Sequence, residues 1–549
     1  MSSVPATPVA PGEPRPAASA KPAAAGGPGR PGAGAAPLSG STLAIGTVAL
    51  SLATFMNVLD TSIANVSIPA IAGDFGVAPN QGTWVITSFA VANAISVPLT
   101  GWLTQRFGQV RLFTTSVLLF VLASLLCGLA PNLQMLIAFR VLQGAVAGPM
   151  IPLSQTLLLA SYPPARAGVA LATWSMTTLV APVVGPLVGG WISDNWTWPW
   201  IFYINVPVGI AAAWFTWRIY AKRESPTRKV PVDRVGLGLI VLWVGALQLM
   251  LDKGKELDWF SSREIVALAV AAAVGFVFFL IWELTDEHPI VDLKLFARRN
   301  FAVGAAALAL AYGLFFGNVV LVPLWLQQYM GYTATQAGII LAPVGFFAIL
   351  LSPLVGRNLG RFDARWLTTV AFVTFAIVMY LRSRFTVQTD IATLMVPTIV
   401  QGIAVAFFFV PLMSISLSGL GPDRLPAASG LTNFTRITAG AFGTSISTTL
   451  WDDRAQMHHA QLAEQISALN PNAQSALAAL GSQGMPSDQS LSMINRLIDQ
   501  QAYTMSADEI FLASAIVFSL LVLLIWTSKP PRAAKAAAGG GPPAGLDAH

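Results

Sequence analysis

Fourteen apolar runs dominate the chain, each close to the ~20 residues that a helix needs to cross a lipid bilayer. They fall at about residues 43–66, 82–104, 111–130, 133–158, 167–192, 199–219, 235–251, 264–284, 301–326, 336–356, 366–383, 389–416, 429–451 and 509–527. Only 10% of the 549 residues are charged, whereas a soluble domain carries about a quarter. The chain is therefore predicted to be an all-α integral membrane protein. Its net charge of +6 is expected to face a membrane surface and not nucleic acid.

The basic residues predict the orientation of these helices. An even number of crossings puts both termini on one side of the membrane. Of the 31 Lys and Arg residues, 22 fall on the side of the N-terminus and seven, including Arg382 and Arg384, fall in the opposite loops. Because cytoplasmic loops carry the excess of Lys and Arg, both termini are expected in the cytoplasm.

Two short repeats divide the helices into halves. Gly101-Trp-Leu-Thr-Gln-Arg-Phe107 returns as Gly356-Arg-Asn-Leu-Gly-Arg-Phe362, and Gln143-Gly144 returns as Gln401-Gly402. This offset exceeds six helices, which predicts two six-helix bundles, at 41–220 and 296–528, separated by an inserted pair of helices within 221–295. The segments 1–40 and 529–549 are rich in Ala, Pro and Gly and are expected to be disordered tails.

Residues 452–508 form a long stretch on the side opposite the termini, with apolar residues at helical spacing. A structureless connection of this length is uncommon, so a short helical hairpin is expected. Two interpretations remain open: a solvated cap, or a docking surface for a periplasmic partner.

Asp60 lies inside the first apolar run, in Leu59-Asp-Thr-Ser-Ile-Ala-Asn-Val66. A charge in that position costs at least ~2.5–3.5 kcal/mol and marks a functional candidate; the alternatives are a structural ion pair or a residue exposed at a helix end. Burial would favour the protonated carboxyl, and a nearby cation would favour the ionised form. Asp60 is thus a candidate for binding and releasing a proton.

Arg140 lies in the fourth run, in Arg-Val-Leu-Gln-Gly144. Asp60 and Arg140 are each about 10 Å from the outer face if the two helices run in opposite directions. Equal depth makes an electrostatic coupling between them feasible, although Arg140 could instead be a structural anchor bonded to carbonyl groups. In the thirteenth run, Asn433 and Arg436 are a further polar pair, and Arg436 could extend to the cytoplasmic interface.

Taken together, these motifs resemble those of the major facilitator superfamily. Gly101, Gln105, Arg106, Gly108 and Arg111 lie in a segment similar to its cytoplasmic loop signature, and Arg140-x-x-Gln143-Gly144 is similar to its fourth-helix signature. The fifth-helix glycines and prolines resemble its drug–proton antiporter signature, carried by Pro182, Gly185, Pro186, Gly189 and Gly190. The pattern Leu59-Asp60-x-x-Ile63-x-Asn65-Val66-x-x-Pro69 resembles the first helix of the fourteen-helix antiporters. The candidate coupling residues are therefore Asp60 and Asn65 from the first helix, and Arg140 and Gln143 from the fourth.

Further segments resemble the EmrB-like pumps of that superfamily; they are Asn205-Val-Pro207, Asn433-Phe-Thr-Arg436 and Met457-His-His-Ala-Gln-Leu462. The resemblance implies proton-driven export of hydrophobic toxic compounds across the inner membrane. It also implies a periplasmic EmrA-like adaptor and an outer-membrane TolC-like channel as partners. One departure is Gln105, which stands where the loop signature carries an acid and puts a charge-based gating latch in doubt.

Other functions have less support in the sequence. Export of a dedicated metabolite, such as a siderophore or an amino acid, would use the same scaffold. A receptor would need a cytoplasmic output domain, and an enzyme would need a catalytic cluster. No metal site, cofactor or nucleotide-binding loop is expected, since the four His residues lack ligand spacing and no Gly-x-x-x-x-Gly-Lys-Ser/Thr sequence occurs. The energy source would be the proton gradient.

Overall fold

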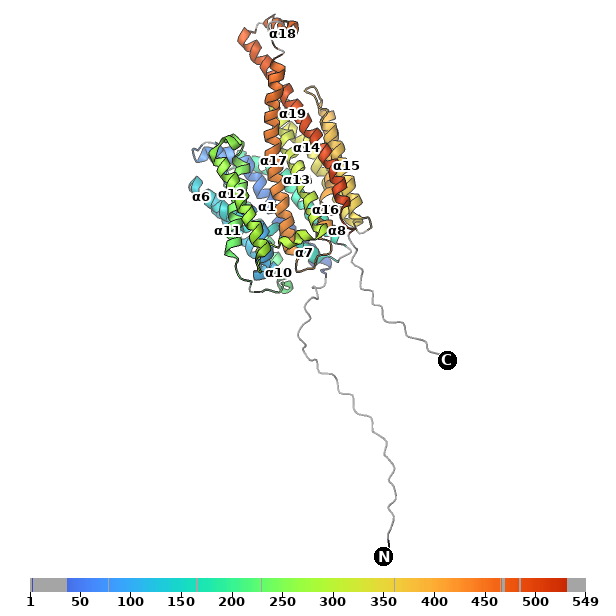
Figure 1. Ribbon diagram of the computed structural model, residues 1–549. Coiled ribbons are helices and arrows are strands. Elements are labelled where there is room, and N and C mark those ends of the chain that lie inside the picture. The colour runs from blue at the N-terminus through green and yellow to red at the C-terminus, as the bar shows by residue number, and fades with distance from the viewer. Residues whose placement is uncertain are drawn as a thin grey trace, which may run out of the picture. The chain divides into compact units, whose positions relative to one another are not determined.

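The computed structural model describes residues 37–530 together with Ser2, apart from Ala78, Pro164, Ala165, Lys229, Gly360 and six positions between 465 and 484. The chain divides into two units, Met1–Ala35 and Ala36–His549, and the second contains every helix described below. The predicted disorder of 1–40 and 529–549 falls mostly outside the described residues. Within the described part, every regular element is helical (Figure 1).

The first predicted bundle contains α1 to α10. Its elements are α1 (Gly40–Asp74), α2 (Pro79–Gly82), α3 (Trp84–Ser96), η1 (Val97–Leu99), α4 (Thr100–Phe107), α5 (Gln109–Gly128), α6 (Leu133–Ala147), α7 (Met150–Ser161), α8 (Ala167–Asn195), α9 (Trp200–Tyr203) and α10 (Asn205–Tyr220). α1 packs against α8 and α10, and α6 packs against α3 and α5. The inserted pair, α11 (Arg234–Lys253) and α12 (Arg263–Thr285), packs chiefly against itself, and α11 also contacts α3 and α17.

The second predicted bundle contains α13 to α19. Its elements are α13 (Arg299–Gln328), α14 (Ala334–Asn358), α15 (Ala364–Arg382), α16 (Ile391–Leu417), α17 (Leu425–Ala463), α18 (Pro471–Ser482) and α19 (Ser487–Trp526). α13 packs against α17, while α16 packs against α14 and α15. The packing partners of α16 in this bundle thus correspond to those of α6 in the first.

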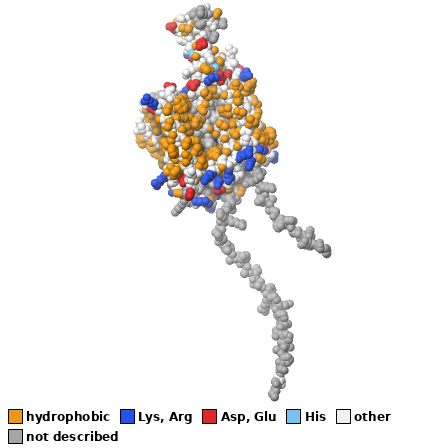
Figure 2. All heavy atoms as spheres, viewed as in Figure 1, with side chains coloured by type: hydrophobic (Ala, Val, Ile, Leu, Met, Phe, Trp, Pro, Cys, Tyr) orange, Lys and Arg blue, Asp and Glu red, His pale blue; other side chains and the backbone are white. Residues whose placement is uncertain are grey.

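Twelve stretches of the described chain are long and apolar enough to cross a membrane. They coincide with twelve of the fourteen predicted segments; the other two lie on α8 and α17, so the count of fourteen is not confirmed. α17 is rich in Ser, Thr and Gly, which lowers its hydropathy. The hydrophobic belt around the helices is visible in Figure 2, where Lys and Arg gather along the lower edge of the face shown.

The two bundles touch each other on the side where the described chain begins and ends. A Cβ atom added to Gly101 on α4 would lie 2.6 Å from the Ala427 Cβ on α17. A Cβ atom added to Gly168 on α8 would likewise clash with the carbonyl oxygen of Gly356 on α14. Leu38 marks this side, since its N–H donates to the Ser161 carbonyl at 2.9 Å, next to the start of α8. The glycines therefore allow close contact between the bundles at this end.

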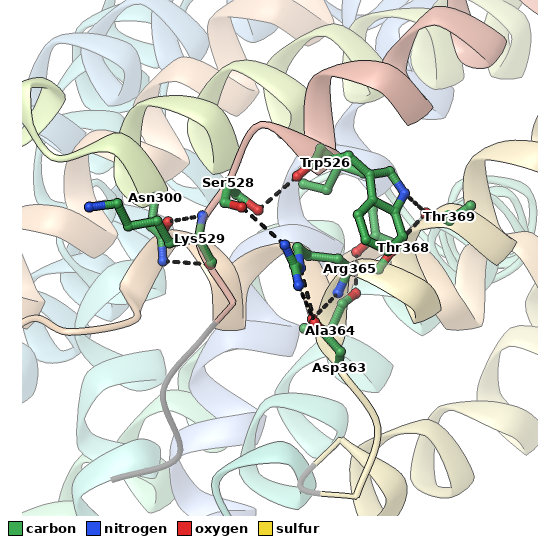
Figure 3. A network of polar contacts seen from close by, with 10 residues as sticks. Asn300, Asp363, Ala364, Arg365, Thr368, Thr369, Trp526, Ser528 and Lys529 are labelled. Atoms are coloured by element: carbon green, nitrogen blue, oxygen red, sulfur yellow. Dashed lines mark hydrogen bonds and ion pairs between the residues drawn. The ribbon is translucent and has the colours of Figure 1, made fainter.

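The end of α19 is fixed to the same side by a polar network (Figure 3). The Asn300 amide of α13 pairs with the Lys529 backbone through bonds of 2.8 and 3.1 Å. Arg365 forms an ion pair with Asp363 at 2.7 Å, donates to the Ser528 carbonyl at 3.3 Å and stacks on the Trp526 ring at 4.9 Å. Three helices are thereby joined where the described chain ends.

The prediction of helical structure in 452–508 is confirmed. The segment is built from the extended end of α17, the short helix α18 and the extended start of α19, which lie beyond the other helices in Figure 1. Arg454 and His458 both contact Glu509, at 2.7 and 3.1 Å, and His459 contacts Asp499 at 2.8 Å. These pairs join α17 to α19, which explains the neighbouring histidines without a metal ion.

Candidate functional site

The centre of the first bundle holds a buried polar network around Asp60. Asp60 lies on α1, Arg140 and Gln143 lie on α6, and Asn205 is the first residue of α10. α6 begins at Leu133 because the Asn132 side chain accepts a hydrogen bond from the Met135 N–H at 2.9 Å. Arg140 and Gln143 are three residues apart on that helix, so they share one face.

Both oxygens of Asp60 are hydrogen-bonded. Oδ2 accepts from the Arg140 guanidinium at 2.6 Å, and Oδ1 accepts from Gln143 Nε2 at 3.1 Å and Asn205 Nδ2 at 2.9 Å. All four side chains are at most 2% exposed. The structure therefore brings together three of the four predicted coupling residues and adds Asn205 to them.

Arg140 has other partners besides the carboxylate. It donates to the Val85 carbonyl at 3.0 Å and to Gln143 Oε1 at 2.6 Å. Its guanidinium also lies 4.2 Å from the centre of the Phe89 ring and 5.6 Å from that of Phe202. Contact with an aromatic face stabilises a cation. The guanidinium is therefore held by several contacts besides its ion pair with Asp60.

The fourth predicted residue, Asn65, is not part of this network. It is exposed on α1, and none of the hydrogen bonds of Asp60 involves it. Five residues of helix separate the two by more than a third of a turn in direction. Its role in coupling stays a prediction.

Sequence reasoning missed Asn205 as a site residue, because it stands among apolar residues and far from Asp60 in the chain. Asn205 Nδ2 also donates to Ser124 Oγ at 3.0 Å, and Ser124 in turn donates to the Phe202 carbonyl at 2.9 Å. Cys127 completes the surroundings, with Sγ 3.6 Å from Gln143 Oε1. The one available signal was the resemblance of Asn205-Val-Pro207 to the pumps named above.

The loop signature lies between α4 and α5, with Gly101 at the contact between bundles. Gly108 has φ of +87°, a region that favours glycine. The Arg106 guanidinium donates to the Val230 carbonyl at 2.7 Å, and the Arg111 side chain is exposed. Gln105 is exposed, and its backbone carbonyl accepts a hydrogen bond from the Arg228 N–H at 2.8 Å.

Glu224 places a carboxylate next to the loop signature. Its oxygens accept from the N–H groups of Val110 and Arg111 at 3.0 and 2.8 Å, at the start of α5. A carboxylate at a helix N-terminus is stabilised by the helix dipole. The charge at this end of α5 thus comes from the segment after α10, a contact that the loop signature itself does not predict.

The antiporter signature lies on α8, where α8 packs against α1. Gly185 faces Ser62, and a Cβ added to Gly189 would lie 3.1 Å from the Ile63 side chain. Both contacts are within three residues of Asp60, so these glycines bring α8 close to the polar site. Gly190 also lies on α8, but the structure does not describe its surroundings or the side chains of Pro182 and Pro186.

Arg436 is buried, 5% exposed, which corrects the interpretation that it extends to the interface. Asn433 is also buried, and its Nδ2 lies 3.4 Å from Gln155 Oε1 of α7. Arg382, counted among loop charges above, is likewise buried at the end of α15, where it donates to Gln401 Oε1 at 2.7 Å. It therefore gives no information on orientation.

Asp60 is thus a buried carboxylate whose two oxygens are bound by one guanidinium and two amides. Arg140 also contacts Gln143 and the ring of Phe89, apart from its ion pair with Asp60. The described residues contain no group of His, Cys, Asp and Glu arranged to hold a metal ion.

Comparison with known proteins agrees with this architecture. Residues 50–444 match the Major Facilitator Superfamily. The chain is similar to the Multidrug export protein EmrB of Escherichia coli K12, with 54% identity over 89% of this chain and 96% of that protein. It is 51% identical to the Fatty acid resistance protein FarB of Neisseria gonorrhoeae, over 89% of this chain and 97% of FarB.

A solved structure has the same fold at low sequence identity. The human organic anion transporter MFSD10 superposes with a TM-score of 0.57 and 12% identity, over 89% of this chain and 100% of that one. The two paired helical bundles, the buried site on α1 and the matches over most of the chain lead to one conclusion. This multi-pass membrane protein belongs to the major facilitator superfamily, as an EmrB-like member.

Proposed function

We propose that the chain is a drug:proton antiporter that exports hydrophobic toxic compounds across the inner membrane. The observation that carries this proposal is the buried contact of 2.6 Å between Asp60 and Arg140. The relatives named for multidrug export and fatty acid resistance support apolar compounds as the substrates.

In the proposed cycle, the two bundles move against each other, and proton binding at Asp60 accompanies release of the drug outside. The close contacts at Gly101 and Gly168 close one side of the molecule in this structure. We assign that side to the cytoplasm, with both termini, so the state described would be closed to the cytoplasm. Inward passage of the proton would then reset the pump.

The proton gradient supplies enough free energy for this exchange. One charge that crosses 100 mV releases ~2.3 kcal/mol, and one pH unit adds ~1.36 kcal/mol. Together they sustain a gradient of about five hundredfold for a neutral substrate. ATP is not needed.

We further propose that this pump works with an EmrA-like periplasmic adaptor and a TolC-like outer-membrane channel. The support is the extension of α17 and α19 beyond the membrane-spanning helices, with α18 at its end (Figure 1). Exposed apolar side chains on this extension, such as Leu491 and Leu497, would suit a protein partner better than a solvated cap.

The test is transport into inverted vesicles under an imposed pH gradient. Asp60→Asn should abolish drug uptake that depends on the gradient, because an amide cannot carry the proton. Asp74→Asn is the matched control. It changes a carboxylate on the same helix that accepts a hydrogen bond from Trp198 Nε1 at 2.8 Å. Full gradient-dependent uptake by correctly folded Asp60→Asn protein would contradict the proposal.

A further inference from the structure

Arg436 lies inside a cage of three aromatic rings. Its guanidinium carbon is 4.8 Å from the centre of the Tyr312 ring, 5.1 Å from that of Phe409 and 5.9 Å from that of Trp174. Trp174 is held in place by a bond of 3.0 Å from its Nε1 to Ser154 Oγ, and it stacks on Phe409 with centroids 5.2 Å apart. We call Trp174, Tyr312 and Phe409 the aromatic cage.

The cage joins the two bundles within the membrane-spanning part of the helices. Trp174 comes from α8 of the first bundle, whereas Tyr312, Phe409 and Arg436 come from α13, α16 and α17 of the second. Arg436 lies about 10 Å beyond residue 429, where its apolar run begins, at 1.5 Å per residue, and therefore lies within the ~30 Å hydrocarbon core. Substrate sites of transporters with repeated halves lie at the interface between the halves.

No carboxylate in the described part of the chain pairs with Arg436. Its Nε is buried without a hydrogen-bond acceptor; one nitrogen of Arg140 also lacks an acceptor, but Arg140 has a carboxylate partner in Asp60. A buried charge is normally paired. The aromatic rings do not replace a hydrogen-bond acceptor here, because the Nε–H bond lies in the plane of the guanidinium and does not point at a ring that the guanidinium covers. The second bundle therefore contains a cation at the interface without its anion.

Neighbouring polar groups lack partners as well, and most of them are donors. Gln155 Nε2 and Thr432 Oγ1 are buried without a partner, as is the acceptor Asn433 Oδ1. Thr432 and Asn433 precede Arg436 by one helical turn, and Gln155 contacts Asn433 from α7. A carboxylate offers only acceptors, so its chemistry matches these unpaired donors.

We propose that Arg436, with Gln155 and Thr432, binds the anionic group of an amphipathic substrate whose apolar body lies against the aromatic cage. The ligand class is an organic monoanion, such as a carboxylate, on an aromatic or aliphatic body. This inference deepens the proposed transport function and rests on it for the path by which the ligand enters. In this structure the rings cover the guanidinium, so binding requires the bundles to part.

A purely structural role is the rival explanation: the cage could lock the bundles together through contacts between the cation and the rings. The two roles differ in what they predict. A lock would affect all substrates alike, whereas a binding site distinguishes an anion from a neutral molecule of the same shape.

The experiment uses a fluorescent pyrene carboxylate and its methyl ester, which share one apolar body. Binding to the purified full-length protein is measured by fluorescence, and the preference is the ratio of the two dissociation constants. The wild type should prefer the carboxylate. Arg436→Gln should weaken carboxylate binding about tenfold to a hundredfold, the range for a hydrogen bond to a charged group, and leave ester binding unchanged. Arg436→Lys should keep part of the preference.

Two variants serve as controls. Arg382→Gln removes another buried guanidinium, which contacts Gln401 and lies outside the cage, and should leave the preference unchanged. Gln155→Met removes one of the unpaired donors with little change in volume and should lower the preference, which tests the site even where Arg436→Gln does not fold. Equal weakening of both ligands by Arg436→Gln, or no carboxylate preference in the wild type, would overturn the proposal.

Failure of this site can be told apart from failure of proton coupling. Binding of the pyrene carboxylate needs no proton gradient, so Asp60→Asn protein should keep the wild-type preference. If that variant loses coupled transport but retains the preference, the anion site and the coupling site are separate, as proposed. If the carboxylate binds by preference but neither ligand is transported under a gradient, the transport function fails and the binding site stands.

Discussion

The contact between Asp60 and Arg140 predicts that two substitutions of similar size have unequal effects on stability. Asp60→Asn leaves the Arg140 guanidinium, which is fully buried and cannot lose its charge. Removal of one partner from a buried ion pair costs ~3–5 kcal/mol when the other charge stays. Arg140→Gln leaves a carboxyl that can bind a proton and still accepts hydrogen bonds from Gln143 and Asn205, so we expect a loss of about 1–3 kcal/mol.

The double variant Asp60→Asn/Arg140→Gln carries neither charge. It should be more stable than the sum of the single losses predicts, because residues in contact usually show interaction energies of about 0.5–3 kcal/mol. The assay is thermal unfolding of the purified protein in detergent, with all four forms at one pH. The reasoning fails if Asp60→Asn unfolds at the same temperature as the wild type, or if the two losses simply add.

Two further changes test contacts on the side where the chain ends. Gly108→Val should lower stability by about 1–3 kcal/mol, because φ is +87° there and the new side chain would meet Glu224; an unchanged unfolding temperature would contradict the strain. At Asp363, burial raises the pKa of the carboxyl, but hydrogen bonds and charge from Arg365 outweigh burial and lower that pKa. Because the pKa of Asp363 is lower in the folded state, its ionised carboxylate stabilises the fold above the ordinary pKa of about 3.9. This stabilisation is lost as the pH falls through the lower pKa that Asp363 has in the folded state. The protection of the amides at the start of α15 from hydrogen exchange, relative to the unfolded chain at the same pH, should therefore fall in acid, and Asp363→Asn, which can still cap the helix, should remove this pH dependence.

The helical framework could be predicted from the sequence because it depends on local properties. Every predicted apolar run lies on a helix, and the helical content of 452–508 followed from its spacing and length. Breaks were harder to predict: the fourth run is interrupted between α6 and α7 at Gly148-Pro149, and the second at η1. An apolar run shows where the chain avoids water but does not show where its axis bends.

The site was only partly predictable, since its parts come from distant segments. Asp60 and Arg140 were identifiable because a charge in an apolar run is conspicuous. Asn205 and Glu224 were not, because polar side chains near helix ends and in loops are common, and only the packed structure shows what they contact. Arg382 illustrates the reverse error: it ends a helix and therefore resembles a loop charge in sequence, although the fold buries it.

The repeated halves show most clearly what a sequence repeat can and cannot predict. Gln143 and Gln401 occupy equivalent places, and each accepts a hydrogen bond from a buried arginine, at 2.6 and 2.7 Å. The arginines differ in origin, however: Arg140 lies on the same helix as its glutamine, whereas Arg382 reaches Gln401 from α15. Each glutamine is bonded to an arginine because a buried amide oxygen needs a hydrogen-bond donor. That donor can come from any helix that packs nearby. A sequence repeat thus predicts the helical framework and the polar positions within it. The placement of charge depends on which helix supplies the partner of each polar residue. The two halves differ in chemistry for that reason.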